Sequence, residues 1–290
     1  MNVLVTGGHG MLGRDLVPRL REAGHDVRAP RHAEVALEEK GALEAWLGDW
    51  TPERVYHLAA WTDVDGCEKD PERARLSNVV ASERVAALAF RLEAGVLALS
   101  TDYVFDASAP PPIPPDAVPM PLNVYGRTKA QGEEAIRRVV KRAWIVRVSW
   151  LCGPSGRNFI EAIKARIAQG QPLSVVDDQR GSPTFTFDLA PALVRLPQVA
   201  PPGTWHLSNQ GECTWFEFAA EILRRSGASV PLKRTTTCEL NRPALRPAYS
   251  VLDTSATTRL LGHDLPPWQD ALDRYEQAAA SARTAGVPHA

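Results

Sequence analysis

The feature that most constrains the fold is a run of glycines near the N-terminus. The apolar residues 2–6 are typical of a short strand, residues 11–23 of a helix, and GGHGMLG lies between them. Glycines spaced G-x-x-G-x-x-G after a strand and before a helix indicate a dinucleotide site, because they allow a tight turn, close approach of the backbone and close helix packing. A purely structural turn is the alternative interpretation. The expected cofactor contacts in this loop are Gly7, Gly10, Met11, Leu12 and Gly13.

Strand-like and helix-like segments alternate through the first half of the chain. The further expected strands are residues 26–29, 54–59, 96–100 and 144–149, and the further expected helices are 40–50, 71–92 and 124–140. This alternation predicts an α/β fold, a Rossmann-like doubly wound parallel sheet that binds ligands at the carboxyl ends of its strands.

Beyond about residue 150 the alternation breaks down, and proline and glycine become frequent. We therefore expect residues 1–150 to form the dinucleotide-binding domain. Residues 151–290 should form mainly a smaller, mixed α/β substrate lobe, partly interleaved with the first domain. Residues after Ala280 are expected to fray.

The segment at residues 109–121, APPPIPPDAVPMP, contains too many prolines for a helix or a central strand. Its position between the fourth strand and the following helix predicts a stiff loop over the ligand edge. Two roles remain open for it, a spacer and a cover over the substrate.

Composition excludes several classes of protein. The 290 residues carry a net charge of −1 without a basic cluster, so no nucleic-acid polymer is expected as a partner. No apolar run is long enough for a signal peptide or a membrane span. The four cysteines form no C-x-x-C motif, which favours reduced thiols in a cytoplasmic protein over a metal or redox site. They are Cys67, Cys152, Cys213 and Cys238.

The end of the second strand indicates the type of cofactor. An acidic residue there usually binds the ribose 2′-hydroxyl of NAD, whereas an arginine accommodates the 2′-phosphate of NADP. This chain has Arg31 and no carboxylate before Glu34, so we predict NADPH, with NADH as the alternative. After the third strand, the small residues Ala59 and Ala60, followed by Thr62, would let a cofactor approach the backbone, although packing explains the alanines equally well.

A tyrosine and a lysine four residues apart indicate the chemistry. Tyr125 and Lys129 would share one helix face, where an ammonium is expected to lower the pKa of the phenol and make it an acid–base catalyst. Ser100 and Thr101 end the fourth strand, and the Thr101 hydroxyl could donate to the same substrate oxygen. A local turn or helix-capping role is the alternative for Thr101.

Together these motifs resemble the dTDP-4-dehydrorhamnose reductase family of the extended short-chain dehydrogenase/reductase superfamily. The matching strings are VTGGHGMLG, HLAAWTDVDGCE, STDYVF, LNVYGRTKAQGE, RVSWLCG, DDQRGSPT, GTWHLSNQGECTWFEFA and RPAYSVLDT, which run from residue 3 to 254. The resemblance implies Thr101, Tyr125 and Lys129 as catalytic residues, with Ser100 and the Tyr125–Lys129 pair also at the cofactor. The positions that it implies near the substrate are Val64, Thr101, Asp102, Tyr103, Asn123, Trp150, Arg246 and Tyr249. For Trp150, an ordinary core position is the alternative.

The chain departs from the family pattern at two places. Arg31 and Ala36 stand where members often carry aspartates, which puts the usual adenosine contacts in doubt. Some members dimerise through an acidic metal site, but beside Asp15 this chain offers Phe187 where a second carboxylate would be needed, so we predict no metal.

The resemblance implies NADPH-dependent reduction of the C4 ketone of dTDP-4-dehydro-L-rhamnose, by a monomer or a homodimer. Two alternatives are reduction of another nucleotide-linked 4-keto-6-deoxyhexose and a non-catalytic NADP-binding regulatory subunit.

Overall fold

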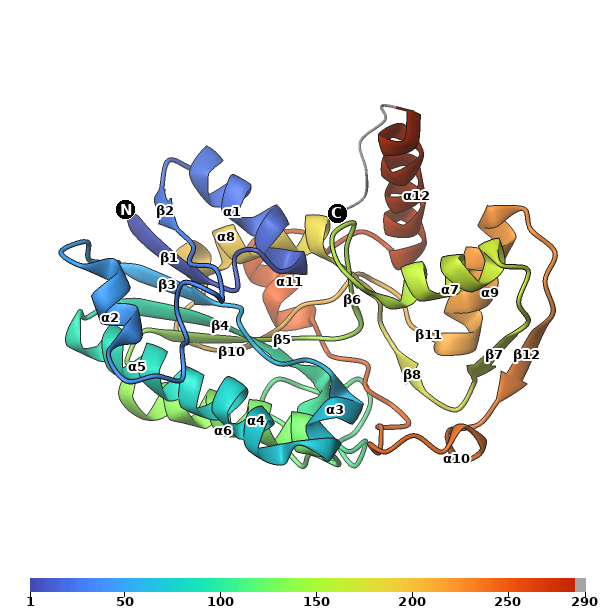
Figure 1. The fold of residues 1–290 in the computed structure, drawn as a ribbon, viewed down its shortest axis with the longest axis horizontal. Coiled ribbons are helices and arrows are strands. Elements are labelled where there is room, and N and C mark those ends of the chain that lie inside the picture. Colours follow the sequence, from blue (N-terminus) through green and yellow to red (C-terminus); the bar gives the residue numbers. More distant parts are fainter. Residues whose placement is uncertain (285–290) are drawn as a thin grey trace.

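The computed structural model describes residues 1–284 and, within them, the side chains of residues 1–278. At its centre is a six-stranded, wholly parallel sheet in the order β10-β5-β4-β3-β1-β2 (Figure 1). Its strands are β1 (Asn2–Thr6), β2 (Asp26–Arg28), β3 (Arg54–His57), β4 (Gly95–Thr101), β5 (Ala143–Val148) and β10 (Gly203–His206). The predicted α/β fold with a doubly wound parallel sheet is confirmed.

Helices cover both faces of this sheet. Alternate residues of β1 point to opposite faces, so Val3 and Val5 pack in one core cluster and Leu4 packs in the other. The helices on the first face are α1 (Met11–Glu22), α8 (Thr186–Val199) and α11 (Ser255–Leu261). Those on the second face are α2 (Ala42–Leu47), α5 (Ala81–Arg91) and α6 (Val124–Val139). The strand patterns are apolar on both faces because both faces are buried.

The expected long helix at residues 71–92 is present, but it contains an irregular turn. It consists of α4 (Pro71–Arg75), a π-helical turn η1 (Leu76–Val80) and α5, and it is preceded by a short helix, α3 (Val64–Lys69). The π turn carries Asn78, whose buried amide binds the backbone of Trp61 and the hydroxyl of Thr128. A sequence period does not reveal such a turn, because the chain remains helical on both sides of it.

The smaller lobe lies to the right of the sheet in Figure 1 and packs around its own core of aromatic and aliphatic residues. Its helices are α7 (Phe159–Ala168), α9 (Trp215–Ser226), α10 (Thr237–Leu240) and α12 (Trp268–Thr284). Its strands are β6 (Leu151–Cys152), β7 (Leu173–Val176), β8 (Arg180–Gly181), β9 (Thr184–Phe185), β11 (Cys213–Thr214) and β12 (Leu232–Thr235). They pair as three short two-stranded sheets.

Segments after residue 150 contribute to both parts of the molecule. The strand β10 extends the large sheet beyond β5, and α8 packs against α1. The chain after Ala280 continues the helix α12 to Thr284, and residues 285–290 lie outside the described residues.

The proline-rich loop packs against a later segment of the chain. Ile113 forms an isolated bridge with Leu252, and the buried Arg147 donates to the carbonyl of Pro115 at 3.2 Å. None of the residues 109–121 lines any of the three cavities described in the next subsection. These contacts favour a packing role for the loop over that of a substrate cover.

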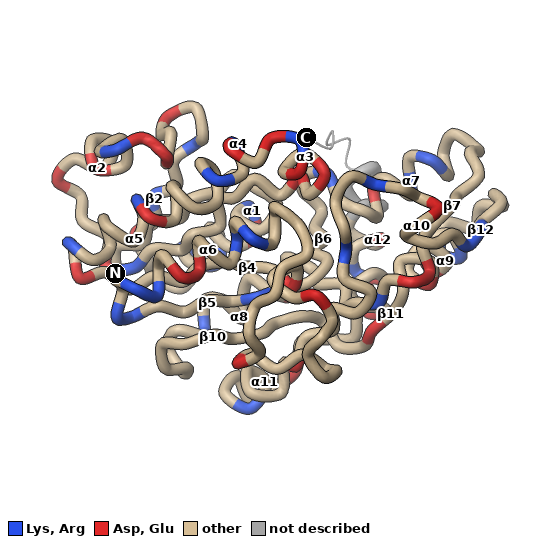
Figure 2. Tube along the Cα trace, turned by 90° about the horizontal axis from the view of Figure 1, so that it is seen from below, with Lys and Arg blue, Asp and Glu red and all other residues tan. Residues whose placement is uncertain are grey.

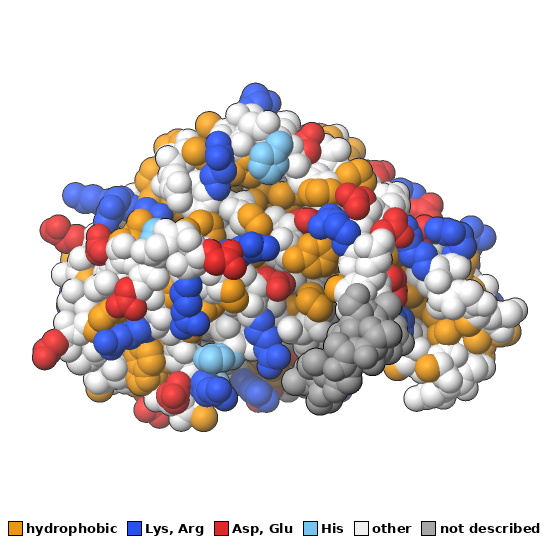
Figure 3. Space-filling model, turned by 90° about the horizontal axis from the view of Figure 1, so that it is seen from above, with side chains coloured by type: hydrophobic (Ala, Val, Ile, Leu, Met, Phe, Trp, Pro, Cys, Tyr) orange, Lys and Arg blue, Asp and Glu red, His pale blue; other side chains and the backbone are white. Residues whose placement is uncertain are grey.

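Charged residues of both signs are distributed along the chain (Figure 2). On the face seen from above, basic and acidic side chains alternate with small apolar patches (Figure 3). No helix within residues 1–284 is long and apolar enough to cross a membrane.

Candidate active site

A cleft of about 410 Å³ lies at the carboxyl edge of the large sheet. Its walls are formed by the loops that follow β1, β3 and β4, by the first turn of α6 and by the chain after β5. Of the residues predicted from the sequence, the cleft brings together Gly7, Gly10, Met11, Leu12, Gly13, Ala60, Thr62, Val64, Ser100, Thr101, Asp102, Tyr103, Tyr125 and Trp150. Residues spread over 140 positions of sequence therefore line one cavity.

The glycine loop fits tightly against its neighbours. Gly7 has a φ of +72°, and a Cβ at this position would lie 2.7 Å from the backbone nitrogen of Ala59. A Cβ on Gly13 would lie 2.5 Å from the carbonyl oxygen of Gly7. The helix α1 begins after Gly10 without a side-chain cap, which leaves its first N–H groups available to an anion. The loop thus has the features that binding of a dinucleotide requires.

Arg31 and Ala59 line a second, smaller hollow of about 280 Å³ at the side of the glycine loop, together with Pro30 and His32. Glu34 does not line this hollow, and its carboxylate accepts the backbone N–H of Arg31 at 2.6 Å. The hollow shares Gly7 and Gly10 with the main cleft, so the two adjoin the same glycine loop.

Tyr125 lies in the first turn of α6, beside Thr101 at the end of β4. Its ring meets that of Tyr103 edge-on, with 5.8 Å between the ring centroids. Burial raises the pKa of the Tyr125 phenol, and a hydrogen bond with Thr101 works in the opposite direction without outweighing it. The expected lowering of this pKa by Lys129 is not found: burial is the largest cause of the shift, and Lys129 is not among its causes. The phenol is protonated at neutral pH.

Lys129 lies one turn further along α6 and is buried. Its ammonium donates to the carbonyl of Leu99 at 2.8 Å. Burial lowers the pKa of Lys129 to about 8, and the charge of Glu133 works in the opposite direction.

Glu133 lies a further turn along α6 and is itself held by Arg147 at 2.7 Å and by the hydroxyl of Ser100. A buried network of charged groups therefore extends beneath the tyrosine–lysine pair.

The structure shows the capping role of Thr101, and its donation to a substrate oxygen stays a prediction. Its hydroxyl oxygen accepts the N–H of Tyr103 at 3.2 Å and caps the 3-10 turn η2 (Asp102–Val104). The same hydroxyl donates to the Asp102 carboxylate at 3.0 Å, and burial raises the pKa of Asp102 to about 6. Donation from Thr101 to a substrate oxygen therefore requires its hydrogen to turn away from Asp102.

Trp150 is held in a strained conformation at the floor of the cleft. Its φ is +46°, its ring stacks on Trp215 with 3.6 Å between centroids, and a Cβ on Gly181 would lie 2.5 Å from the indole. A backbone strain at a non-glycine residue of a cleft wall is typical of functional positions. Trp215 was not expected from the sequence, because it begins the distant helix α9.

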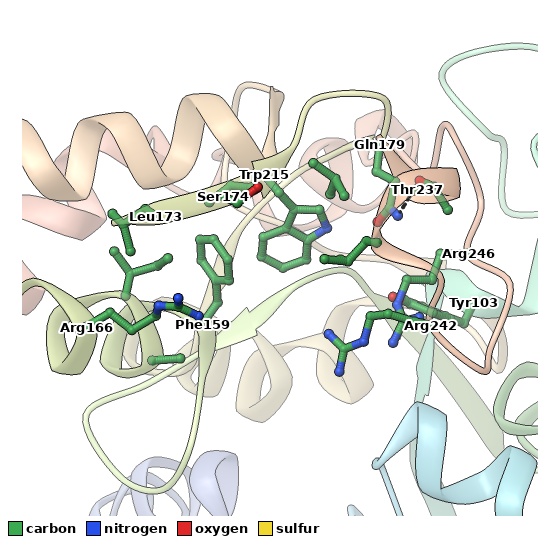
Figure 4. Close-up of a pocket in the computed structure, with 15 residues that line it drawn as sticks. Tyr103, Phe159, Arg166, Leu173, Ser174, Gln179, Trp215, Thr237, Arg242 and Arg246 are labelled. Carbon is green, nitrogen blue, oxygen red and sulfur yellow. Dashed lines mark hydrogen bonds between the residues drawn. The ribbon is translucent and has the colours of Figure 1, made fainter. Parts of the chain in front are cut away.

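A further cavity of about 430 Å³ continues from the cleft into the smaller lobe and shares Tyr103 and Trp215 with it. Figure 4 shows Phe159 and Trp215 on one side of this cavity and Tyr103, Arg242 and Arg246 on the other. The amide of Gln179 donates to Thr237 at its rim. Aromatic faces opposite guanidinium groups suit a ligand with a flat ring and an anionic group.

Three of the predicted substrate positions lie outside the main cleft. Arg246 lines the second cavity, where it is paired with Asp65 at 3.1 Å. Asn123 lines neither cavity, because its amide caps α6 at Gly126 and binds the carbonyl of Leu245. Tyr249 also lies outside both, and its hydroxyl donates to Glu212 at 3.1 Å.

No group of three or more potential metal ligands occurs among the described residues. Burial raises the pKa of the Asp15 carboxyl. The absence of a metal stays a prediction.

The sheet order, the glycine loop and the tyrosine–lysine pair define the chain as a Rossmann-type reductase of the short-chain dehydrogenase/reductase class. The family model described as the RmlD substrate binding domain matches residues 1–281. The chain therefore belongs to this family, that of the dTDP-4-dehydrorhamnose reductases, and the resemblance stated from the sequence is confirmed.

Individual relatives agree. The chain is 40% identical over 280 residues to a probable dTDP-4,6-dihydroxy-2-methyloxan-3-one 4-ketoreductase of Streptomyces antibioticus, covering 94% of this chain and 93% of that protein. It is 38% identical to a dTDP-4-dehydrorhamnose reductase of Streptomyces griseus, over 93% of this chain and 91% of that protein. The crystal structure of a dTDP-4-dehydrorhamnose reductase from Bacillus anthracis in complex with NADP superposes with a TM-score of 0.90 at 32% identity, covering 96% and 99% of the two chains.

Proposed function

We propose that this chain is an NADPH-dependent oxidoreductase that reduces the C4 ketone of dTDP-4-dehydro-L-rhamnose to give dTDP-L-rhamnose. The observation that carries the proposal is the meeting of Thr101 and Tyr125 with the glycine loop in one cleft, which adjoins an aromatic and basic cavity. Lys129 does not line the cleft but lies buried one turn along α6 from Tyr125, bound to the carbonyl of Leu99. One cavity suits a dinucleotide and the reacting sugar, and the other suits the nucleotide that carries the sugar.

The described residues fit NADPH. Gly10 allows the pyrophosphate to approach the start of α1, Gly13 lets α1 pack closely on the loop, and Arg157 lines the same cleft. Arg31 lies where a 2′-phosphate would be recognised. The bound cofactor supplies the hydride.

The protein's own groups handle the proton and the charge. Tyr125 stays protonated because burial raises its pKa, so it is ready to donate its proton to the C4 oxygen as that oxygen becomes negative. The positive charge of Lys129 stabilises the phenolate that remains. Thr101, once its hydrogen turns from Asp102, donates to the same oxygen and stabilises its charge.

The nucleotide would occupy the second cavity. Phe159 and Trp215 offer aromatic faces to the thymine ring, and Arg242 and Arg246 offer donors to the diphosphate. Trp150, held by Trp215, would form the floor on which the hexose packs.

Two other functions are compatible with the same fold. Reduction of a different dTDP-linked ketosugar uses the same chemistry, and the Streptomyces antibioticus relative bears the name of such an enzyme. A regulatory subunit without activity has no need for a buried tyrosine–lysine pair beside a hydroxyl donor, and the geometry of the site argues against it.

Initial rates of NADPH oxidation test the proposal. The purified chain should oxidise NADPH with dTDP-4-dehydro-L-rhamnose, with a higher kcat/KM than with other dTDP-4-keto-6-deoxyhexoses. Tyr125→Phe should lower kcat at least about 100-fold while NADPH still binds. A higher kcat/KM for another sugar would show that the other sugar is the preferred substrate. Full activity of Tyr125→Phe would contradict the mechanism.

A further inference from the structure

Two arginines of the nucleotide cavity meet at one carboxylate oxygen. Arg242 and Arg246 lie between α10 and α11, and Asp65 lies in α3 of the large domain. The Oδ2 atom of Asp65 is 2.7 Å from Nη2 of Arg242 and 3.1 Å from Nη2 of Arg246. Both arginines line the cavity, as Figure 4 shows, whereas Asp65 lines neither cavity.

The carboxylate holds the backbone of this loop as well as its side chains. Its second oxygen, Oδ1, accepts the N–H of Ala244 at 3.2 Å, and Arg246 donates to the carbonyl of the same residue at 2.9 Å. Burial raises the pKa of Asp65, but the hydrogen bonds and charges of the arginines outweigh it, so that the pKa is lowered and the group stays ionised. The segment from Arg242 to Arg246 is thus folded around one negative charge.

Two guanidinium groups so close together repel each other unless an anion lies between them. The side chain of Arg242 is 54% exposed, so without Asp65 it would be free to turn into solvent. A guanidinium carries five N–H donors, and the bonds to Asp65 and Ala244 use two of those of Arg246. Donors therefore remain for an anionic ligand while both side chains are fixed.

We propose that Asp65 is a positioning residue that holds Arg242 and Arg246 in place to receive the diphosphate of the nucleotide sugar. This inference rests on the proposed function. Fixing the two long side chains before binding removes the entropy loss that the ligand would otherwise have to overcome. The same contact links α3 of the large domain to the segment that borders the smaller lobe.

Titration calorimetry with dTDP and with thymidine tests the inference. Asp65→Asn keeps the size of the side chain and removes its charge. We expect this variant to bind dTDP about tenfold more weakly than the wild type, and thymidine, which lacks phosphates, with unchanged affinity.

Asp188→Asn is the matched control. This substitution breaks the ion pair between Asp188 and Arg274, whose atoms lie 2.7 Å apart and which also links the two parts of the molecule. Neither residue lines either cavity. Both ligands should bind it as they bind the wild type.

The outcomes separate the inference from the proposed function. The positioning role would be overturned if Asp65→Asn bound dTDP as tightly as the wild type or more tightly. It would also be overturned if the variant lost affinity for dTDP and thymidine by the same factor. A wild type that does not bind dTDP would overturn the nucleotide site itself, and the role of Asp65 with it.

Discussion

Among single residues, burial has opposite effects on the pKa values of the two proposed catalytic groups, Tyr125 and Lys129. Burial raises the pKa of the Tyr125 phenol and lowers that of the Lys129 ammonium to about 8, because it disfavours the charged form of each. A proton donor with a raised pKa keeps its proton over the whole working range. The neighbouring ammonium is the group whose charge is lost first as the pH rises.

This difference predicts the pH dependence of the reaction. Lys129 is charged below about pH 8 and neutral above it, so kcat/KM for the ketone should fall as the pH rises through about 8. Initial rates between pH 6 and pH 10 would measure this limb, with NADPH binding followed separately at each pH. A rate that stays constant to pH 10 would contradict the role of the Lys129 charge.

Arg31 leads to a prediction about the choice of cofactor. Its side chain borders the hollow beside the glycine loop, and Glu34 is engaged with the Arg31 backbone. Arg31→Ala should lower kcat/KM for NADPH about tenfold, because a charge-assisted contact to the 2′-phosphate is lost. The value for NADH serves as the internal control and should not change, since NADH lacks that phosphate. An equal loss with both cofactors would refute the assignment.

At the scale of elements, the site depends on how closely α6 approaches the end of β4. Gly126 makes this approach possible, because a Cβ there would lie 2.0 Å from the carbonyl oxygen of Tyr103. The 3-10 turn η2, which directly follows the hydroxyl-bearing end of β4, therefore packs closely against the first turn of α6.

Gly126→Ala should separate these two elements. We expect kcat/KM to fall by roughly 100-fold, since a displacement of about 1 Å between reacting groups has effects of this size. The exposed Gln131→Ala in the same helix is the control, and it should retain the rate of the wild type. Unchanged kinetics of Gly126→Ala would show that the close contact does not set the catalytic geometry.

Sequence patterns predicted the elements of the first half well, because strands buried on both faces and helices of regular period leave clear signals. The patterns missed α3, and they could not show that β10 returns to the large sheet, because that pairing joins residues about 60 positions apart. The role of Asp65 was equally inaccessible, since its partners lie about 180 residues away.

The part of the site that depends on residues close together in the sequence was predictable. Tyr125 and Lys129 are neighbours on one helix, so their spacing alone places them together. Trp215 reaches Trp150 only through the packing of the smaller lobe, and no local pattern indicates that contact. The pKa of Tyr125 was predicted in the wrong direction, because the sequence shows the nearby lysine but not the depth of burial.

At the scale of the whole molecule, the two parts divide the work of recognition. The large sheet carries the glycine loop and the proposed reacting groups, and the smaller lobe carries most of the second cavity. They meet at Tyr103 and Trp215, which line both cavities. This arrangement suits a substrate with a sugar at one end and a nucleotide at the other.

The transfer of deuterium from NADPH labelled at both C4 positions tests this account most directly. Incubation with dTDP-4-dehydro-L-rhamnose should give dTDP-L-rhamnose that carries one deuterium at C4 of the sugar, detected by NMR and mass spectrometry. Tyr125→Phe should form this product at least about 100-fold more slowly. Product without deuterium at C4, or labelled at another carbon, would contradict the proposed reduction.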